Sequence, residues 1–175
     1  MNHLYYNKFK TALGWFHTLE SDRGLVHINF GDLTEDRFLQ GMEKKYRQYE
    51  IIVGGKENAK AERQLKAYLA GRLKKFNLRL DIQGTVFQKK ILRKVAAIPY
   101  GTVATYGEIA ARAGHPGASR AVGSVNRNNP LAPVIPCHRV VAAGGLGGYG
   151  GGYGEGLKMK RRLLRLEGVD KYEEG

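Results

Sequence analysis

Residues Thr105 to Arg127 read TYGEIAARAGHPGASRAVGSVNR, and their pattern indicates how the second half of the chain is organised. Thr105 and Glu108 stand three residues apart, which is typical of the capping box that begins a helix. Gly114 is expected to end that helix, and Pro116 suits the first turn of the next one. Two short helices joined by a tight glycine-containing turn predict a helix-turn-helix.

The second of these helices, at about residues 116–128, is amphipathic. Its buried stripe is expected at Ala118, Ala121, Val122 and Val125. Its outer face is expected to carry Arg120, Gly123, Ser124 and Arg127. Small residues let a helix backbone approach a DNA groove closely, and arginines can contact phosphates or enter the duplex. This face is therefore a candidate nucleic-acid surface.

One further helix is expected before the helix-turn-helix. Thr85 and Gln88 form another capping box, and Pro99-Tyr100-Gly101 ends the helix. One face of this helix is apolar and carries Phe87, Ile91, Leu92 and Val95. The opposite face is lysine- and arginine-rich and is interpreted as solvated surface.

The first half of the chain resembles a small α/β unit without a chemical signature. Strands are expected at residues 13–19, 26–30 and 51–53, the first two joined by a hairpin turn at residues 21–24. A helix capped by Thr34 would place apolar residues inward at Phe38, Leu39, Met42, Tyr46 and Tyr49. A second helix, with Leu65, Tyr68 and Leu69 inward, would end at Gly71.

These patterns predict two domains in a chain of 175 residues. Residues 1–82 are expected to form an α/β (α+β) domain with a small antiparallel sheet. Residues 83–175 are expected to form a mainly helical domain that contains a winged-helix-like helix-turn-helix.

The charge balance suggests a polyanionic partner. The chain carries 29 basic and 16 acidic residues, a net charge of +13, and no acidic residue lies between Glu108 and Glu155. Nucleic acid is the first candidate partner, and a generally basic surface without a specific partner is the alternative. One cysteine excludes an internal disulfide, and no apolar run approaches the roughly 20 residues of a membrane span. The expected protein is soluble and intracellular, without a membrane partner.

The segment Pro133-Val134-Ile135-Pro136-Cys137-His138-Arg139-Val140 is the candidate for chemistry. A lone cysteine in an apolar strand is commonly an inert core residue. Here two prolines stiffen the approach, and the neighbouring His138 and Arg139 are expected to lower the pKa of the Cys137 thiol. Adjacent side chains of an extended chain point to opposite sides, so His138 would act as a base through a water.

Residues 87–168 resemble the 6-O-alkylguanine-DNA alkyltransferases, also called methylated-DNA–protein-cysteine methyltransferases. The order and spacing of five motifs carry the resemblance. They are Pro99-Tyr100-Gly101, Thr105-Tyr106-Gly107-Glu108-Ile109-Ala110, Ser119-Arg120-Ala121-Val122-Gly123, Asn128-Asn129-Pro130 and Ile135-Pro136-Cys137-His138-Arg139-Val140.

The resemblance implies a role for each matching residue. Cys137 would accept the alkyl group, His138 would be its base through water, and Glu167 would orient His138. Tyr106 would donate a hydrogen bond to the departing guanine, and Asn129 would tie the DNA-binding helix to the cysteine segment. Arg120 would fill the gap left by a flipped nucleotide. The DNA-binding set implied is Tyr106, Arg120, Ala121, Gly123, Ser124 and Arg127, and the substrate pocket implied is Val140, Tyr149, Gly150 and Gly151.

The implied function is direct-reversal DNA repair, in which each molecule acts once and needs neither a cofactor nor a metal. The implied partner is double-stranded DNA, bound in the minor groove by a monomer in the nucleoid-containing cytoplasm. Whether alkylated thymine is also a substrate stays open. The unit Gly-Gly-Tyr-Gly occurs twice, at 147–150 and 151–154, where the family has it once, so Tyr149 and Tyr153 both stay candidates for the pocket.

Three other classes of protein are weighed against this interpretation. A helix-turn-helix regulator explains the basic helix but not the Pro-Cys-His-Arg string. An alkyltransferase-like damage sensor would lack the acceptor cysteine, which this chain retains. A cysteine hydrolase is disfavoured because Cys137 and His138 are adjacent in sequence.

Overall fold

The computed structural model describes residues 2–54, 59–150 and 154–172. The chain forms two compact units, Met1–Gln83 and Gly84–Gly175, and each is described by itself. The first is α+β and the second is mainly helical, so the predicted fold class is confirmed. Within the described ranges, no helix has the length and apolar character that crossing a membrane requires.

The sheet of the first unit has the strand order β3-β2-β1-β4. Three consecutive strands pair antiparallel: β1 (Asn2–Thr11), β2 (Gly14–Ser21) and β3 (Gly24–Gly31). The sequence predicts the hairpin that β2 and β3 form. β4 (Tyr49–Val53) pairs parallel with β1, so the sheet is mixed rather than antiparallel throughout. The sequence did not predict β1, the longest strand.

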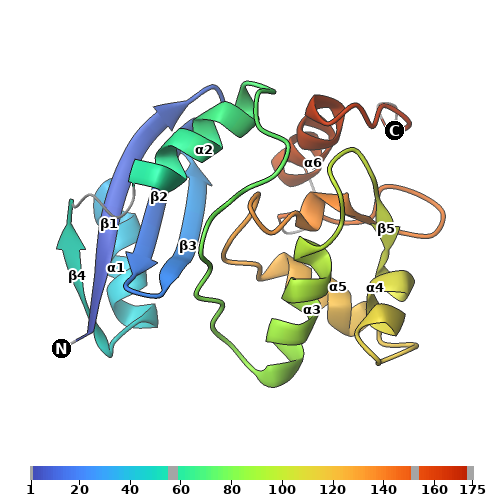
Figure 1. The fold of residues 1–175 in the computed structure, drawn as a ribbon, viewed down its shortest axis with the longest axis horizontal. Coiled ribbons are helices and arrows are strands. Elements are labelled where there is room, and N and C mark those ends of the chain that lie inside the picture. The colour runs from blue at the N-terminus through green and yellow to red at the C-terminus, as the bar shows by residue number, and fades with distance from the viewer. Residues whose placement is uncertain (1, 55–58, 151–153, 173–175) are drawn as a thin grey trace. The chain divides into compact units, whose positions relative to one another are not determined.

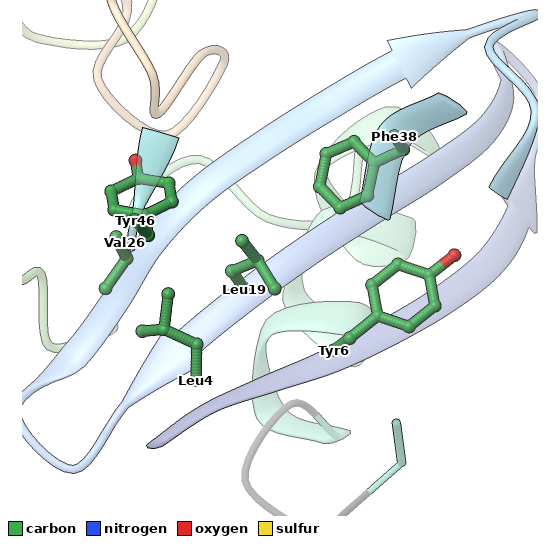
Figure 2. Packing of buried hydrophobic residues seen from close by; sticks show 6 residues of the cluster. All are labelled: Leu4, Tyr6, Leu19, Val26, Phe38 and Tyr46. Atoms are coloured by element: carbon green, nitrogen blue, oxygen red, sulfur yellow. The ribbon is translucent and has the colours of Figure 1, made fainter. Parts of the chain in front are cut away.

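Two helices in the described part of this unit cover opposite faces of the sheet (Figure 1). α1 (Glu35–Lys45) packs on the face that carries Leu4 and Tyr6, where Phe38 is almost fully buried. Figure 2 shows this cluster, which consists of Leu4, Tyr6, Leu19, Val26, Phe38 and Tyr46. α2 (Ala59–Leu69) lies over the alternate face, where Lys66 Nζ stands 5.6 Å above the Phe9 ring.

Three details of α1 differ from the sequence prediction. Thr34 stands at its N-cap, but its side chain makes no capping hydrogen bond. Tyr46 lies one residue beyond the helix, as its C-cap, and Tyr49 opens β4. The helix ends early because the chain must turn to enter the sheet edge. Tyr46 and Tyr49 still reach the core from these positions.

Three short helices form the centre of the second unit (Figure 1): α3 (Val86–Ala96), α4 (Tyr106–Arg112) and α5 (Ser119–Arg127). Both predicted capping boxes, at Thr85 and Thr105, are present. Pro116 instead lies in the turn before α5, which begins only at Ser119. The helices α4 and α5 form the predicted helix-turn-helix.

The buried stripe of α5 is narrower than the sequence predicts. Val122 and Val125 are buried, whereas Ala118 is half-buried and Ala121 is exposed. A nine-residue helix on the surface needs only one apolar ridge to pack on its neighbours. Ala121 is therefore available on the outer face.

The cysteine segment forms a turn and not the extended strand that the sequence suggests. Cys137–Arg139 is a 3₁₀ turn, η1, and the strand β6 (Val140–Val141) follows it and pairs parallel with β5 (Ala104–Thr105). Side chains of a 3₁₀ turn are about a third of a turn apart, so Cys137 and His138 still point in different directions. The helix α6 (Glu155–Leu166) closes the unit.

Candidate active site

A cavity of about 640 Å³ opens beside Cys137. One face of α5 forms one wall, and the glycine-rich segment after β6 forms another. The lining residues are Tyr106, Ser119, Arg120, Gly123, Asn126, Arg127, Cys137, Gly147, Gly148, Tyr149 and Gly150. The volume falls within the range of about 300–1,000 Å³ that is usual for small-molecule sites.

The Cys137 thiol lies at the wall of this cavity and is 5% exposed. Asn129, just beyond the end of α5, donates from Nδ2 to Cys137 Sγ at 3.2 Å and to the Ile135 carbonyl at 2.8 Å. One amide therefore links the end of α5 to the cysteine turn. This is the contact that the resemblance implied for Asn129.

Burial raises the pKa of the Cys137 thiol above its ordinary value. Smaller effects oppose the rise in this pKa, and they are the hydrogen bond from Asn129, the charge of Lys160, a hydrogen bond with the backbone of Cys137 itself and a hydrogen bond with Tyr149. His138 and Arg139 are not among them, so the prediction that these two neighbours lower the thiol pKa is wrong. A base is therefore needed to make the thiolate at neutral pH.

His138 is fully buried and directs one ring nitrogen at Glu167. Its Nε2 lies 2.8 Å from Glu167 Oε1, and Nε2 must donate because a carboxylate only accepts. The Nδ1 atom then carries the basic lone pair. Burial lowers the pKa of His138, which keeps the imidazole neutral and able to take a proton.

The Glu167 carboxylate is shared with Arg139, whose guanidinium is also buried. Arg139 Nε donates to Oε2 at 2.8 Å and its second terminal nitrogen donates to Oε1 at 2.9 Å. A third donor of Arg139 binds the Ile98 carbonyl. Arg139 is thus held inside the unit by a two-pronged ion pair.

The Pro99-Tyr100-Gly101 motif holds the end of α6, where Glu167 stands. Tyr100 Oη donates to the Leu166 carbonyl at 2.9 Å, and the Gly101 N–H donates to Glu167 Oε2 at 3.2 Å. Glu167 is the C-cap residue of α6, a position where the helix dipole disfavours a negative charge. The donors around its carboxylate offset that cost.

Lys160 is a site residue that the sequence analysis missed. Its side chain is completely buried, and its ammonium donates to the carbonyls of Val140 at 2.6 Å, Leu146 at 2.7 Å and Gly148 at 3.0 Å. Burial lowers the pKa of Lys160 to about 8. The ammonium ties the glycine-rich wall to β6 and interacts electrostatically with the thiol.

Tyr106 crosses the cavity between α4 and the glycine-rich wall. Its hydroxyl donates to the Gly148 carbonyl at 3.2 Å, and burial raises its pKa, so the phenol keeps its proton. Gly147 beside it has a φ of +72°, and a Cβ there would lie 2.9 Å from the Tyr106 ring. Only glycine fits at that position.

The other implied site residues are distributed as follows. Arg120 and Arg127 line the cavity with exposed side chains, and Gly123 stands between them. Ala121 and Ser124 are exposed on α5 beyond the cavity wall.

Of the implied substrate-pocket residues, Tyr149 and Gly150 line the cavity. Val140 is fully buried and does not line it, contributing its carbonyl to Lys160 instead. Gly151 and Tyr153 lie outside the described residues.

Both halves of the chain match one family. Residues 4–82 match the 6-O-methylguanine DNA methyltransferase ribonuclease-like domain, and residues 86–169 match the DNA binding domain of the same family. A methylated-DNA–protein-cysteine methyltransferase of Methanosarcina acetivorans is 41% identical over 94% of this chain and 99% of the relative. Another, from Mycobacterium bovis, is 51% identical over 59% of this chain and 61% of the relative.

Solved structures agree over nearly the whole chain. A crystal structure of the R37K variant of Mycobacterium tuberculosis OGT has a TM-score of 0.76 at 35% identity, covering 98% of this chain and 94% of that one. OGT from the same organism in complex with DNA has a TM-score of 0.74 at 35% identity, covering 93% and 92% of the two chains. The chain therefore belongs to the 6-O-methylguanine DNA methyltransferase family.

Proposed function

We propose that Cys137 accepts an alkyl group from the 6-oxygen of alkylated guanine in DNA, and that each molecule does so once. The observation that carries the proposal is a lone thiol at the wall of a base-sized cavity, beside a helix with exposed arginines. The relatives named methylated-DNA–protein-cysteine methyltransferases support the same chemistry.

The proposed reaction begins with removal of the thiol proton. His138 takes this proton through a water, and Glu167 stabilises the imidazolium that forms. The thiolate attacks the alkyl carbon, the S–C bond forms as the C–O bond breaks, and the bonding electron pair stays on the guanine oxygen. The guanine anion then takes up the proton that His138 had removed from the thiol. Guanine is thereby restored, and a thioether remains on Cys137. The Tyr106 hydroxyl stabilises the departing base by donating a hydrogen bond.

The alkylated base must leave the duplex to reach Cys137, because base stacking hides its 6-oxygen. In the proposed complex, α5 lies in the minor groove and Arg120 fills the gap left by the flipped nucleotide. In this proposal the protein acts as a monomer in the cytoplasm, where the DNA lies. In the same proposed complex, α5 contacts the DNA backbone through Arg127, Ser124 and Ala121. Gly123 lets this helix approach the DNA closely.

The stoichiometry of transfer tests this proposal. A thioether has no good leaving group, and the chain has no second cysteine to remove the alkyl group from Cys137. With excess DNA carrying a labelled methyl on the 6-oxygen of guanine, we expect at most one repaired lesion per molecule. Mass spectrometry should find the methyl on the peptide that holds Cys137. Repaired lesions that clearly outnumber protein molecules would refute the mechanism.

Arg120→Ala is expected to slow repair of duplex DNA by at least about tenfold, since flipping a nucleotide costs a few kcal/mol. Transfer from free 6-O-benzylguanine should change little, because a free base needs no flipping. The measurement is the single-turnover rate on both substrates. Arg112→Ala, at an exposed arginine of α4 that does not line the cavity, is the matched control. Equal losses on the two substrates would remove the flipping role.

A further inference from the structure

Asn126, on α5, lines the cavity and carries a buried carboxamide. Its Oδ1 and Nδ2 atoms are both buried without a hydrogen-bond partner among the described residues. Buried polar groups in folded proteins are nearly always paired, because an unpaired one costs stability. A buried amide left unpaired at the cavity that Cys137 also lines therefore suggests a partner that arrives with the substrate.

The neighbouring amides of the same segment show a different arrangement. Asn128 Nδ2 donates to the Ser124 carbonyl at 2.9 Å, and Asn129 donates to Cys137 and to Ile135. Two of three nearly consecutive asparagines thus have partners inside the unit. Asn126 differs from Asn128 in its direction, because it lies three residues after Gly123 on the same helix face, and both Gly123 and Asn126 line the cavity.

We propose that Asn126 hydrogen-bonds the flipped base and makes the cavity select alkylated guanine over alkylated thymine. This inference rests on the proposed function. An amide offers one acceptor oxygen and an N–H donor side by side. A 6-O-alkylguanine presents its 2-amino donor between two ring-nitrogen acceptors, so one amide can both accept from the amino group and donate to a ring nitrogen.

Alkylated thymine lacks this pattern. A 4-O-alkylthymine has acceptors at its ring nitrogen and its 2-oxygen and carries no exocyclic amino group. The Asn126 oxygen would then stay unpaired in the complex. A site built around a hydrogen bond rejects an analogue that lacks the partner group, because its own buried polar atom is left unsatisfied.

The first test uses the unaltered protein with three bases placed at one position of the same duplex. They are 6-O-methylguanine, 6-O-methylhypoxanthine, which lacks only the 2-amino group, and 4-O-methylthymine. Single-turnover rates are expected to be at least about tenfold lower for methylhypoxanthine and methylthymine than for methylguanine. A tenfold change in rate corresponds to the loss of about one hydrogen bond to the base. Equal rates for methylguanine and methylhypoxanthine would overturn the proposal.

The second test compares Asn126→Leu with Asn128→Ala as the matched control. Leucine keeps the size of the side chain and has no polar atom, so Asn126→Leu should unfold at an unchanged or higher temperature. Its rate on methylguanine should fall to its rate on methylhypoxanthine, bringing the ratio of the two near one. Asn128→Ala should keep the ratio of the unaltered protein. If Asn126→Leu fails to fold, Asn126→Ala carries the same comparison.

Two outcomes for the Asn126 variant would overturn the inference: a ratio that stays at its original value, or an equal loss of rate on all three bases. The second outcome would mean that Asn126 only supports the fold. Neither outcome touches the proposed function, which fails instead if the unaltered protein leaves no methyl on the Cys137 peptide.

Discussion

Cys137→Ser is expected to abolish alkyl transfer and leave DNA binding unchanged. A serine hydroxyl holds its proton far more tightly than a thiol, and a neutral oxygen is a poor nucleophile toward an alkyl carbon. The exposed arginines of α5 do not depend on the thiol, so affinity for undamaged duplex should stay within about twofold. The slope of log affinity against log salt, which reports phosphate contacts, should also be unchanged.

Two measurements check this expectation. Labelled methyl transfer should fall to background for Cys137→Ser and equally for Cys137→Ala, while filter or fluorescence binding gives the affinity. Any stoichiometric labelling of the serine variant would mean that the acceptor lies elsewhere in the chain. A large loss of DNA affinity in both variants would mean that Cys137 supports the binding surface.

Glu167→Ala is expected to damage stability and chemistry together. It removes the carboxylate from two buried partners, the Arg139 guanidinium and the His138 ring. Breaking a buried ion pair from one side costs about 3–5 kcal/mol, because an uncompensated charge stays inside. His138 would also lose the group that fixes which ring nitrogen is basic, so transfer by the remaining folded protein should slow strongly.

A glutamate at the other end of α6, Glu155, provides the control for Glu167→Ala. Glu155 pairs with Lys158 at 2.7 Å, with both side chains largely exposed, so Glu155→Ala should leave stability unchanged. Denaturant unfolding measures the difference between the two variants. If they lose equally little stability, the network around Glu167 is not what holds α6 to the cysteine turn.

The parts of the structure that the sequence predicts best are local. Each capping box joins two residues three apart, so Thr85 with Gln88 and Thr105 with Glu108 could be paired by inspection. The contact between His138 and Glu167 spans 29 positions. Before the structure, only the resemblance to a known family predicted that these two residues are in contact.

The missed strand β1 illustrates what periodicity cannot show. A strand with one buried face alternates cleanly, but β1 lies between α1 and α2 and buries residues on both faces, Leu4 and Tyr6 on one and Phe9 on the other. Its parallel partner β4 lies about 47 residues further on and leaves no trace in the local pattern of either strand.

Charged residues of the site were the hardest to predict. Lys160 and Arg139 have the composition of solvated surface, and their partners are carbonyls and a carboxylate between 12 and 41 positions away. One signal was present: Lys160 and Glu167 fall in phase with the buried Leu163 and Leu164 of α6, at helical spacing. A charge inside an apolar stripe is the pattern to look for.

The hydrogen bonds of Lys160 also bear on how this chain tolerates changes in length. All three carbonyls that the ammonium binds, at Val140, Leu146 and Gly148, precede the second Gly-Gly-Tyr-Gly unit in the chain. The cavity wall is thus anchored upstream of that second unit. A change in chain length between that anchor and α6 is therefore expected to leave the three hydrogen bonds of Lys160 in place.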